Sequence, residues 1–457
     1  MTSSARPNII LINCDDLGYG DLGCYGSTVN RTPALDQMAA EGLRFTDFYM
    51  ASPVCSPSRG AMMTGCYPPR IGFGEFNGRP VLFPGDDCGL NPDEMTIAKA
   101  LKQSGYKTKM VGKWHCGDQP EFLPTEHGFD SYFGIPYSND MGRQFEDDKY
   151  PPLPLIRDQE VIQEQPDQAG ITERYVEESV RFLRENKDEP FFLYFAHMYV
   201  HVPIYAPEKF MRESQNGRYG AGVEMIDWAT AAILDELKQL GIDENTLVIF
   251  TSDNGSRARG EGGSNGPLRG HKGQTWDGGQ RVPCLMRWPK GIPGGQTTSG
   301  LATSMDFLPT LAKLCDAKLA EGRMIDGKDI SVLLADATAD SPNEVFFYYW
   351  KNRIEAVRDH EWKLHFCKRD EEGAVVELYN LIEDIGETTN VFDEHPDIVA
   401  SLMAKVEACR EDIGDSELGI IGANCRRIGR VDNPDTLTHY DPSHPYIVAM
   451  YDLKQRG

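Results

Sequence analysis

The chain has 457 residues, a formal net charge of −24 at pH 7 and ordinary fractions of apolar, charged and aromatic residues. Because this length exceeds what one hydrophobic core usually supports, we expect one large domain and a smaller second one. The acidic charge and the absence of a basic run argue against nucleic acids and anionic membrane surfaces as partners. An anionic ligand would need a local group of cations, since screening limits the global repulsion to short range.

Cysteine usage and the first residues bear on the compartment. Eleven cysteines are scattered without paired spacing, and no CxxC motif occurs, which favours reduced, mostly buried thiols over a zinc ribbon or a disulfide framework. Met1 to Pro7 is polar and leads into a strand-like run, so we expect neither a signal peptide nor a transmembrane span. This pattern predicts a cytoplasmic protein, or a periplasmic or secreted one if a signal was removed.

Four predicted strands each have polar residues directly after their carboxyl ends. They are Asn8 to Cys14 before Asp15 and Asp16, Tyr106 to Val111 before Lys113 and His115, Pro190 to Ala196 before His197 and His201, and Thr246 to Ser252 before Asp253 and Asn254. Their continuous apolar runs are typical of buried strands in a parallel sheet, where ligands bind at the carboxyl ends. We therefore expect these polar residues to meet at one edge.

Predicted helices alternate with these strands, which indicates an α/β fold. They cover Ala34 to Glu41, Asp93 to Ser104, Thr172 to Asn186, Tyr219 to Leu240 and Asp306 to Asp316. Residues 118 to 168 hold many prolines and acids, and we interpret them as a long surface insertion. After a composition shift near Asp336 to Pro342, short strands and a helix follow, which predicts a smaller α+β domain with an antiparallel sheet. The predicted strands are Val345 to Trp350, Ala356 to Val357, Trp362 to Phe366 and Val375 to Leu378, before the helix Asp397 to Asp412. The expected domains are residues 1–340 and 341–457.

One stretch presents a candidate nucleophile. Pro57 suits the first turn of a helix, so a helix is predicted over Arg59 to Thr64, with Gly65 closing it. Residue Cys55 would then face free backbone N–H groups and the positive end of a helix dipole, which favours an anion. The alternative is a free cysteine packed beside a helix start.

Asp15, Asp16, Asp253 and Asn254 are hard oxygen ligands that suit Ca²⁺ or Mg²⁺ rather than zinc. For a single pair, solvated loop acids would be the ordinary interpretation, but two matched pairs beside the cysteine motif favour a metal site. His197 and His201 have the spacing of helical zinc ligands. The run before them is strand-like and no Glu follows His197, so a metalloprotease helix is not expected and we treat His197 as structural.

Several motifs share one resemblance. Cys-x-Pro-Ser-Arg-x-x-x-x-Thr-Gly over residues 55–65 resembles the maturation signature of type I sulfatases, in which the cysteine is oxidised to formylglycine. Gly112-Lys113-Trp114-His115, Val200-His201-Val202-Pro203 and Gly270-His271-Lys272-Gly273 are also similar to sulfatase motifs. Glu261 to Pro267 and Phe129 to Gly134 point to the arylsulfatase A and N-acetylgalactosamine-6-sulfatase branch. The resemblance implies an alkaline phosphatase-like fold, with a large mixed, mostly parallel sheet flanked by helices.

The resemblance also implies the parts of a catalytic site. Residue 55, as a formylglycine hydrate, would attack sulfur with help from the metal and Asp253. Ca²⁺ would be bound by Asp15, Asp16, Asp253, Asn254 and an oxygen of residue 55, and the sulfate would be contacted by Arg59, Lys113 and Lys272. His201 with Lys272 would protonate the leaving oxygen, and His115 would deprotonate the second hydroxyl. Ser138 would supply a hydroxyl at the substrate site.

The predicted activity is hydrolysis of a sulfate monoester, with a carbohydrate sulfate such as N-acetylgalactosamine sulfate favoured over an aryl sulfate. A formylglycine-generating maturation enzyme is an implied partner. Two alternatives remain open. The first is a phosphonate monoester or phosphodiester hydrolase of the same fold, and the second is a non-catalytic binder of sulfated ligands in which Cys55 stays a thiol.

Overall fold

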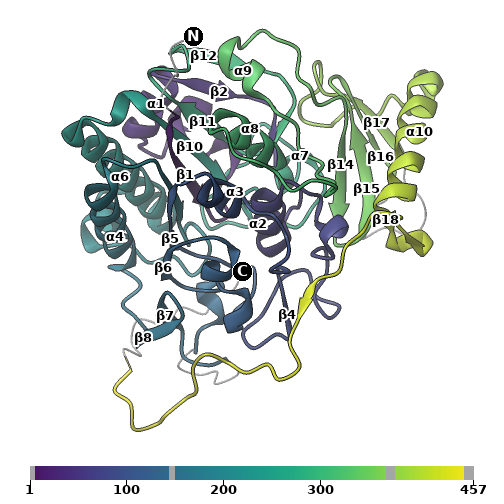
Figure 1. Cartoon of the computed structure of the whole chain (residues 1–457). Helices are drawn as coiled ribbons and strands as arrows, with labels where there is room; N and C mark the ends of the chain where they lie inside the picture. Colours follow the sequence, from purple (N-terminus) through teal and green to yellow (C-terminus); the bar gives the residue numbers. More distant parts are fainter. Residues whose placement is uncertain (1–5, 144–149, 367–375, 447–457) are drawn as a thin grey trace.

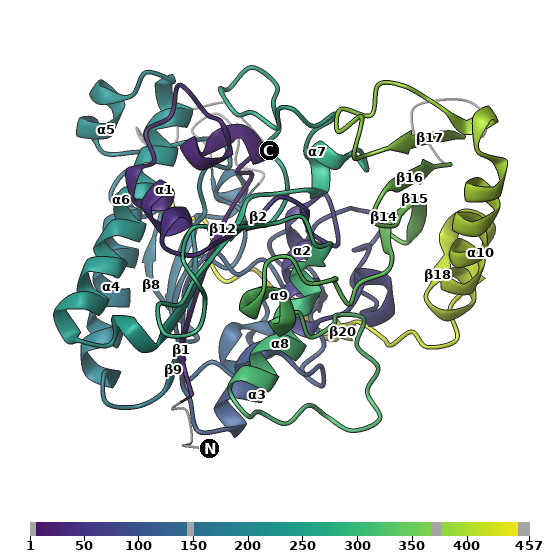
Figure 2. The ribbon, with the colours of Figure 1, turned by 90° about the horizontal axis from the view of Figure 1, so that it is seen from above.

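The computed structural model describes residues 6–143, 150–366 and 376–446. A ten-stranded mixed sheet runs through the larger part of the molecule with helices on both faces (Figures 1 and 2). In spatial order its strands are β12 (Gln296–Thr298), β2 (Leu43–Phe45), β11 (Cys284–Arg287), β10 (Thr246–Ser252), β1 (Asn8–Cys14), β9 (Phe191–Ala196), β5 (Lys107–Gly112), β6 (Ser131–Gly134), β7 (Pro154–Arg157) and β8 (Glu160–Glu164). The expected mixed, mostly parallel sheet is confirmed.

The centre of this sheet is parallel. Strand β1 pairs with β10, with Cys14 opposite Ser252, and with β9, where Asn13 is opposite Ala196. Strand β5 continues the parallel order beside β9, with Gly112 also opposite Ala196. The carboxyl ends of all four predicted strands therefore lie at one edge of the sheet.

Each face of the sheet has its own apolar core, because alternate residues of a strand point to opposite sides. In β1, Ile10 and Ile12 belong to one core cluster, and Ile9 and Leu11 belong to the other. The first face is covered by α1 (Pro33–Ala40), α4 (Ile171–Asn186) and α6 (Gly217–Leu240), with α5 (Glu208–Glu213) packed on α6. The second face is covered by α2 (Cys55–Thr64), α3 (Ile97–Gln103), α8 (Phe307–Leu314) and α9 (Ser331–Ala335).

The prediction of a surface insertion over residues 118 to 168 is wrong. Strands β6, β7 and β8 of this region extend the main sheet beyond β5. Proline does not exclude a strand here, since Pro154 is the first residue of β7, where a missing N–H is tolerated, and Pro120 and Pro124 begin short 3-10 helices. The tight connection to β8 places Asp158 at φ 57°, a conformation that Asp tolerates well.

The second, smaller sheet has four antiparallel strands, as expected, and α10 (Pro396–Asp412) packs on it. Its strands are β14 (Phe346–Trp350), β15 (Arg353–Arg358), β16 (Trp362–His365) and β17 (Glu377–Asn380). Val375, the first residue of one predicted strand, lies outside the described residues.

After α10 the chain returns to the first part of the molecule (Figure 1). There β20 (Gly429–Arg430) pairs with β4 (Cys88–Gly89). The remaining short strands are β3 (Phe48–Tyr49), β13 (Ala302–Thr303), β18 (Gly414–Asp415) and β19 (Ile420–Ile421), and the short helix α7 spans Asp277–Gln280. The chain after α10 thus contacts residues 88 and 89, more than 300 positions earlier in the sequence.

The ten cysteines within the described residues are all free, and eight of them are buried. Cys367 lies outside the described residues. No helix in the described parts of the chain is both long enough and apolar enough to cross a membrane.

Candidate active site

The helix that presents Cys55 begins at Cys55 itself, four residues earlier than predicted. Val54 precedes it in extended conformation, and Gly65 closes it at φ 68°, the left-handed conformation that favours glycine. The side chain of Cys55 is buried, and its Sγ lies 3.4 Å from Asp15 Oδ1. Burial, and next the charge of Asp15, raise the pKa of the thiol well above its usual value. An unmodified Cys55 is therefore protonated and a poor nucleophile.

The two aspartates after β1 meet the polar pair after β10. Ligand atoms of Asp15, Asp16, Cys55 and His201 all lie within 4.8 Å of one another. Asn254 Nδ2 donates to Asp16 Oδ1 at 2.8 Å, and the backbone N–H of Asp16 lies 3.3 Å from an oxygen of Asp253. Buried carboxylates grouped this closely need a cationic partner.

The donor set fits a hard divalent cation. The carboxylates of Asp15, Asp16 and Asp253 and the amide oxygen of Asn254 are the ligand type that Ca²⁺ and Mg²⁺ prefer. Asn254 Oδ1 is buried and has no hydrogen-bond partner among the described residues, although its Nδ2 is fully used. A cation held at this position would satisfy this buried carbonyl oxygen.

Three side-chain cations enter the cluster from different elements. Lys113, after β5, hydrogen-bonds Asp15, and its Nζ donates to Ser138 Oγ at 2.7 Å. Lys272 Nζ lies 2.9 Å from Asp16 Oδ2. Arg59, in α2, donates from Nε to Asp253 Oδ2 at 2.8 Å and from Nη1 to the Lys113 carbonyl at 2.7 Å.

The charges of these groups balance. The carboxylates of Asp15, Asp16 and Asp253 carry three negative charges, and Arg59, Lys113 and Lys272 carry three positive ones. A divalent cation added to this set would leave a surplus of two positive charges in a buried site. Such a site suits an anionic ligand, since the charge would otherwise be uncompensated at low dielectric.

The carboxylates differ in how easily they ionise. Burial opposes ionisation of Asp15, but Lys113 and then His201 and Arg59 lower its pKa well below the usual range. Burial and the charge of Asp15 raise the pKa of Asp253 to about 6. Neighbouring carboxylates with separated pKa values are a common feature of catalytic sites.

Both predicted histidines are buried, and each has one ring nitrogen directed at a backbone carbonyl. His201 Nδ1 lies 2.6 Å from the Val202 carbonyl and bears the hydrogen, so Nε2 faces Asp16 at 3.9 Å. His115 Nε2 contacts the Leu82 carbonyl at 3.0 Å, and its Nδ1 has no hydrogen-bond partner within the described chain. Burial lowers the pKa of each imidazole, with further lowering by Lys113 at His115 and by Lys272 at His201.

His197 is a core residue, as we interpreted it. Its ring lies 4.4 Å from that of Phe195, and burial lowers its pKa to about 3.

Several supporting residues were missed in the sequence. Ser58 Oγ donates to the Asp253 carbonyl, Ser252 Oγ accepts from Leu17 N at 2.9 Å, and Tyr219 OH donates to the Asp16 carbonyl at 3.2 Å. Ser58 stands inside the recognised motif, so its position was a usable signal. Tyr219 lies in α6, about 200 residues from Asp16, and nothing local marks it.

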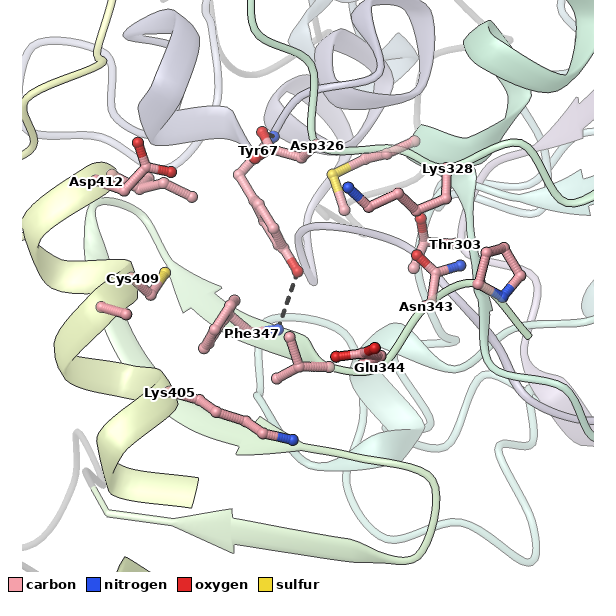
Figure 3. A pocket seen from close by; sticks show the side chains of 15 residues that line it. Tyr67, Thr303, Asp326, Lys328, Asn343, Glu344, Phe347, Lys405, Cys409 and Asp412 are labelled. Atoms are coloured by element: carbon pink, nitrogen blue, oxygen red, sulfur yellow. Dashed lines mark hydrogen bonds between the residues drawn. The ribbon is translucent and has the colours of Figure 1, made fainter. Parts of the chain in front are cut away.

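A separate cavity of about 560 Å³ lies between the two parts of the molecule (Figure 3). Tyr67 lines it just beyond the last turn of α2, together with Lys328, Asn343 and Lys405. Cys55 is at the other end of that ten-residue helix, a helix length of about 15 Å. The cavity is therefore not the catalytic cluster.

The fold and the cluster together define a hydrolase site for an anionic ester, and comparison with known proteins gives the family. A sequence model described as Sulfatase matches residues 7–317, and one described as N-sulphoglucosamine sulphohydrolase, C-terminal, matches residues 271–412. The chain belongs to the sulfatase family, and it is a sulfuric ester hydrolase.

Characterised relatives and solved structures agree. N-acetylgalactosamine-6-sulfatase of Canis lupus familiaris is 41% identical over 378 residues, which cover 79% of this chain and 72% of that protein. Arylsulfatase A of Homo sapiens is 41% identical over 385 residues, covering 79% and 75%. The solved structure of Ps i-CgsB in complex with k-i-k-neocarrahexaose superposes with a TM-score of 0.79 at 32% identity, covering 88% of this chain and 92% of the other.

A phosphonate monoester hydrolase of Agrobacterium radiobacter shares the fold, with a TM-score of 0.64 and coverage of 89% and 95%. At 19% identity, that likeness concerns the fold alone.

Proposed function

We propose that this protein hydrolyses a sulfate monoester carried by a sugar, with Cys55 converted to formylglycine and a calcium ion bound beside it. The observation that carries the proposal is the position of Cys55. It starts α2, its Sγ lies 3.4 Å from Asp15 and close to Asp16 and His201, and three cations reach the carboxylates there. The sugar is favoured because the similar proteins include N-acetylgalactosamine-6-sulfatases and a structure with a bound carrahexaose.

Formylglycine and a divalent cation would each supply one part of the reaction. Formylglycine provides a hydrated aldehyde, in which one hydroxyl forms the new bond to sulfur and loss of the other proton later expels sulfate and restores the aldehyde. In this structure Cys55 Sγ stands where an oxygen of that group would lie. A cation held by Asp15, Asp16, Asp253 and Asn254 would act as a Lewis acid toward sulfuryl oxygens.

Residues of the chain stabilise charge on the sulfuryl group and transfer protons. Arg59, Lys113 and Lys272 stabilise negative charge on the sulfuryl oxygens, and Ser138, bonded to Lys113, fixes the direction of that ammonium group. As the ester O–S bond breaks, the leaving oxygen takes a proton from the imidazolium form of His201 through Nε2, the ring nitrogen that faces the cluster. Asp253 accepts the proton of the attacking hydroxyl, and His115 Nδ1 accepts that of the second hydroxyl.

The decisive experiment is the mass of the peptide that contains Cys55, from protein purified from its own host. Oxidation of CH₂–SH to CHO lowers the mass of this peptide, and we expect the lower mass together with turnover of sulfate esters. An unmodified thiol in a preparation that still turns over sulfate esters would overturn the proposed nucleophile.

Substrate class is tested with the matured protein and three probes: 4-nitrophenyl sulfate, a phenylphosphonate monoester and N-acetylgalactosamine 6-sulfate. We expect both sulfates to be cleaved and the sugar sulfate to have the higher kcat/KM. A higher kcat/KM for the phosphonate would favour the alternative hydrolase. Binding of the sugar sulfate without cleavage would favour the non-catalytic alternative.

A further inference from the structure

A second buried charge network lies outside the catalytic cluster and joins the segment of Lys272 to the smaller sheet. At its centre is Lys363 of β16, whose side chain is fully buried. Its Nζ lies 2.7 Å from Glu387, 3.0 Å from Asp277 and 2.9 Å from the carbonyl oxygen of Thr275. A lysine is rarely buried this completely unless it holds specific partners.

The network reaches a segment that lacks regular structure of its own. Between β10 and the short helix α7, residues 253–276 form bends and turns. Two backbone hydrogen bonds hold Lys272 to the larger part of the molecule. Its own N–H donates to the Ser256 carbonyl at 3.0 Å, and the N–H of Gly273 donates to the Pro53 carbonyl at 2.8 Å. Thr275, only three residues further on, is held by the smaller sheet.

Other contacts at this end come from the smaller sheet and from the loop that follows β17. Thr275 Oγ1 donates to Glu355 Oε2 of β15 at 2.6 Å. The ring of Trp276 stacks on His365 of β16 with centroids 4.4 Å apart. The backbone N–H of Asp277 donates to Glu387 Oε2 at 2.9 Å. The residues shortly after Lys272, from Thr275 to Asp277, are therefore held in place by the smaller sheet and the loop that follows it.

We infer that Lys363 is a positioning residue that holds Lys272 at the catalytic cluster through Thr275 and Asp277. The inference rests on the proposed function, in which Lys272 contacts the sulfuryl group. Lys272 Nζ must lie within hydrogen-bond range of Asp16 and of a sulfuryl oxygen at once. A small displacement of its backbone would break that geometry, and misplacements near 1 Å can cost about 100-fold in rate.

The variant that tests this inference must not leave a buried charge unpaired. Lys363→Met alone would leave Asp277 and Glu387 without their shared cation, which is strongly destabilising. The pair Lys363→Met with Glu387→Gln removes one charge of each sign and keeps an amide oxygen for the Asp277 N–H. Lys363→Arg is a second, milder variant that keeps the positive charge for Asp277 and Glu387 but replaces the single Nζ by a planar guanidinium.

The test is a double-mutant cycle with Lys272→Met, using kcat/KM for 4-nitrophenyl sulfate. If Lys363 acts through Lys272, the paired variant lowers kcat/KM by about 30-fold in the wild-type background but by less than about threefold when Lys272 is already methionine. Equal losses in both backgrounds would show a general structural role and overturn the inference. Should the paired variant fail to fold, the same cycle is run with Lys363→Arg, for which we expect a smaller loss of about threefold in the wild-type background and none when Lys272 is methionine.

A matched control variant distinguishes this effect from a general weakening of the contacts between the part with the ten-stranded sheet and the part with the four-stranded sheet. Asp412→Asn removes the ion pair between α10 and Arg70, which joins the same two parts of the molecule and involves none of residues 270–277. We expect it to change kcat/KM by less than about twofold. Normal activity of Lys272→Met would contradict the role of Lys272 in the proposed function. Additive losses in the cycle would contradict only the positioning role of Lys363.

Discussion

Arg59 and Asp253 form an ion pair in which both side chains are fully buried and Nε and Nη2 each lie 2.8 Å from the same carboxylate oxygen. The pair links the helix that starts at Cys55 to the end of β10. It fixes the guanidinium beside the nucleophile position and fixes one proposed metal ligand with the same contact. Arg59 should therefore contribute both to activity and to the stability of the fold.

Arg59→Ala should lower both activity and stability. We expect kcat/KM for 4-nitrophenyl sulfate to fall by about 1,000-fold, because the variant loses a cation at the sulfuryl oxygens. The free energy of unfolding in urea should fall by about 3 kcal/mol, since Asp253 is left buried without its partner. Arg70→Ala is the control: Arg70 is also buried and paired with two aspartates, so stability should fall while kcat/KM stays within about threefold. Near-normal turnover in Arg59→Ala would contradict the assignment.

His201→Gln should affect poor leaving groups more than good ones. A general acid matters most when the departing oxygen is strongly basic, so we expect a loss of about 1,000-fold for an alkyl or sugar sulfate and about tenfold for 4-nitrophenyl sulfate. The measurement is kcat/KM for both substrates with wild type and variant. Equal losses on the two substrates would contradict a proton donor at His201. His197→Gln, a buried histidine beside Phe195, is the control and should show no dependence on the leaving group.

Removal of divalent cations should lower both stability and activity. Because the ligands are buried carboxylates, Ca²⁺ at 100 times its Kd should raise the free energy of unfolding by about 2.7 kcal/mol. Thermal unfolding with EDTA, with added Ca²⁺ and with added Mg²⁺ measures the effect and distinguishes the two ions. Asp16→Asn should weaken the Ca²⁺-dependent rise in Tm. Asp21→Asn should preserve it, because Asp21 is a nearby buried acid outside the proposed ligand set. The same Tm in all conditions would contradict a structural cation.

Glu178 predicts a pH-dependent contribution to stability away from the site. Burial raises its pKa, but hydrogen bonds from Arg157 and Lys109 outweigh this and lower the pKa to about 2 from 4.5. The stabilisation is therefore complete above pH 4.5 and declines as the pH falls toward 2. Urea unfolding should show Glu178→Gln less stable by about 2 kcal/mol at pH 7, with a smaller difference at pH 3.5. Exposed Glu177, also paired with Arg181, gives a control variant, Glu177→Gln, that should cost less than about 0.5 kcal/mol. A difference for Glu178→Gln that does not change with pH would contradict this explanation.

The sequence predicted those elements whose signal is local. The strands Asn8–Cys14 and Thr246–Ser252 were predicted with their observed bounds, because a strand buried on both faces is a continuous apolar run. Helix α3 begins at Ile97, later than predicted, since Thr96 caps it by accepting from Lys99 N. Residues 131–164 were missed as strands because their segments are short and separated by prolines and turns.

By itself, the sequence determined which residue types are available for chemistry and their order along the chain. The Cys55 motif, with the other sulfatase-like motifs, was sufficient to predict the family, and the polar residues after four strands predicted the edge of the sheet at which the site lies. Only the tertiary structure decided which groups touch. Lys113 meets Ser138, the carbonyl oxygen of Asn254 has no hydrogen-bond partner among the described residues, and Lys363 of the smaller sheet donates to the Thr275 carbonyl. Such contacts join residues far apart in sequence, so they depend on sheet register and on loop paths, which no local pattern specifies.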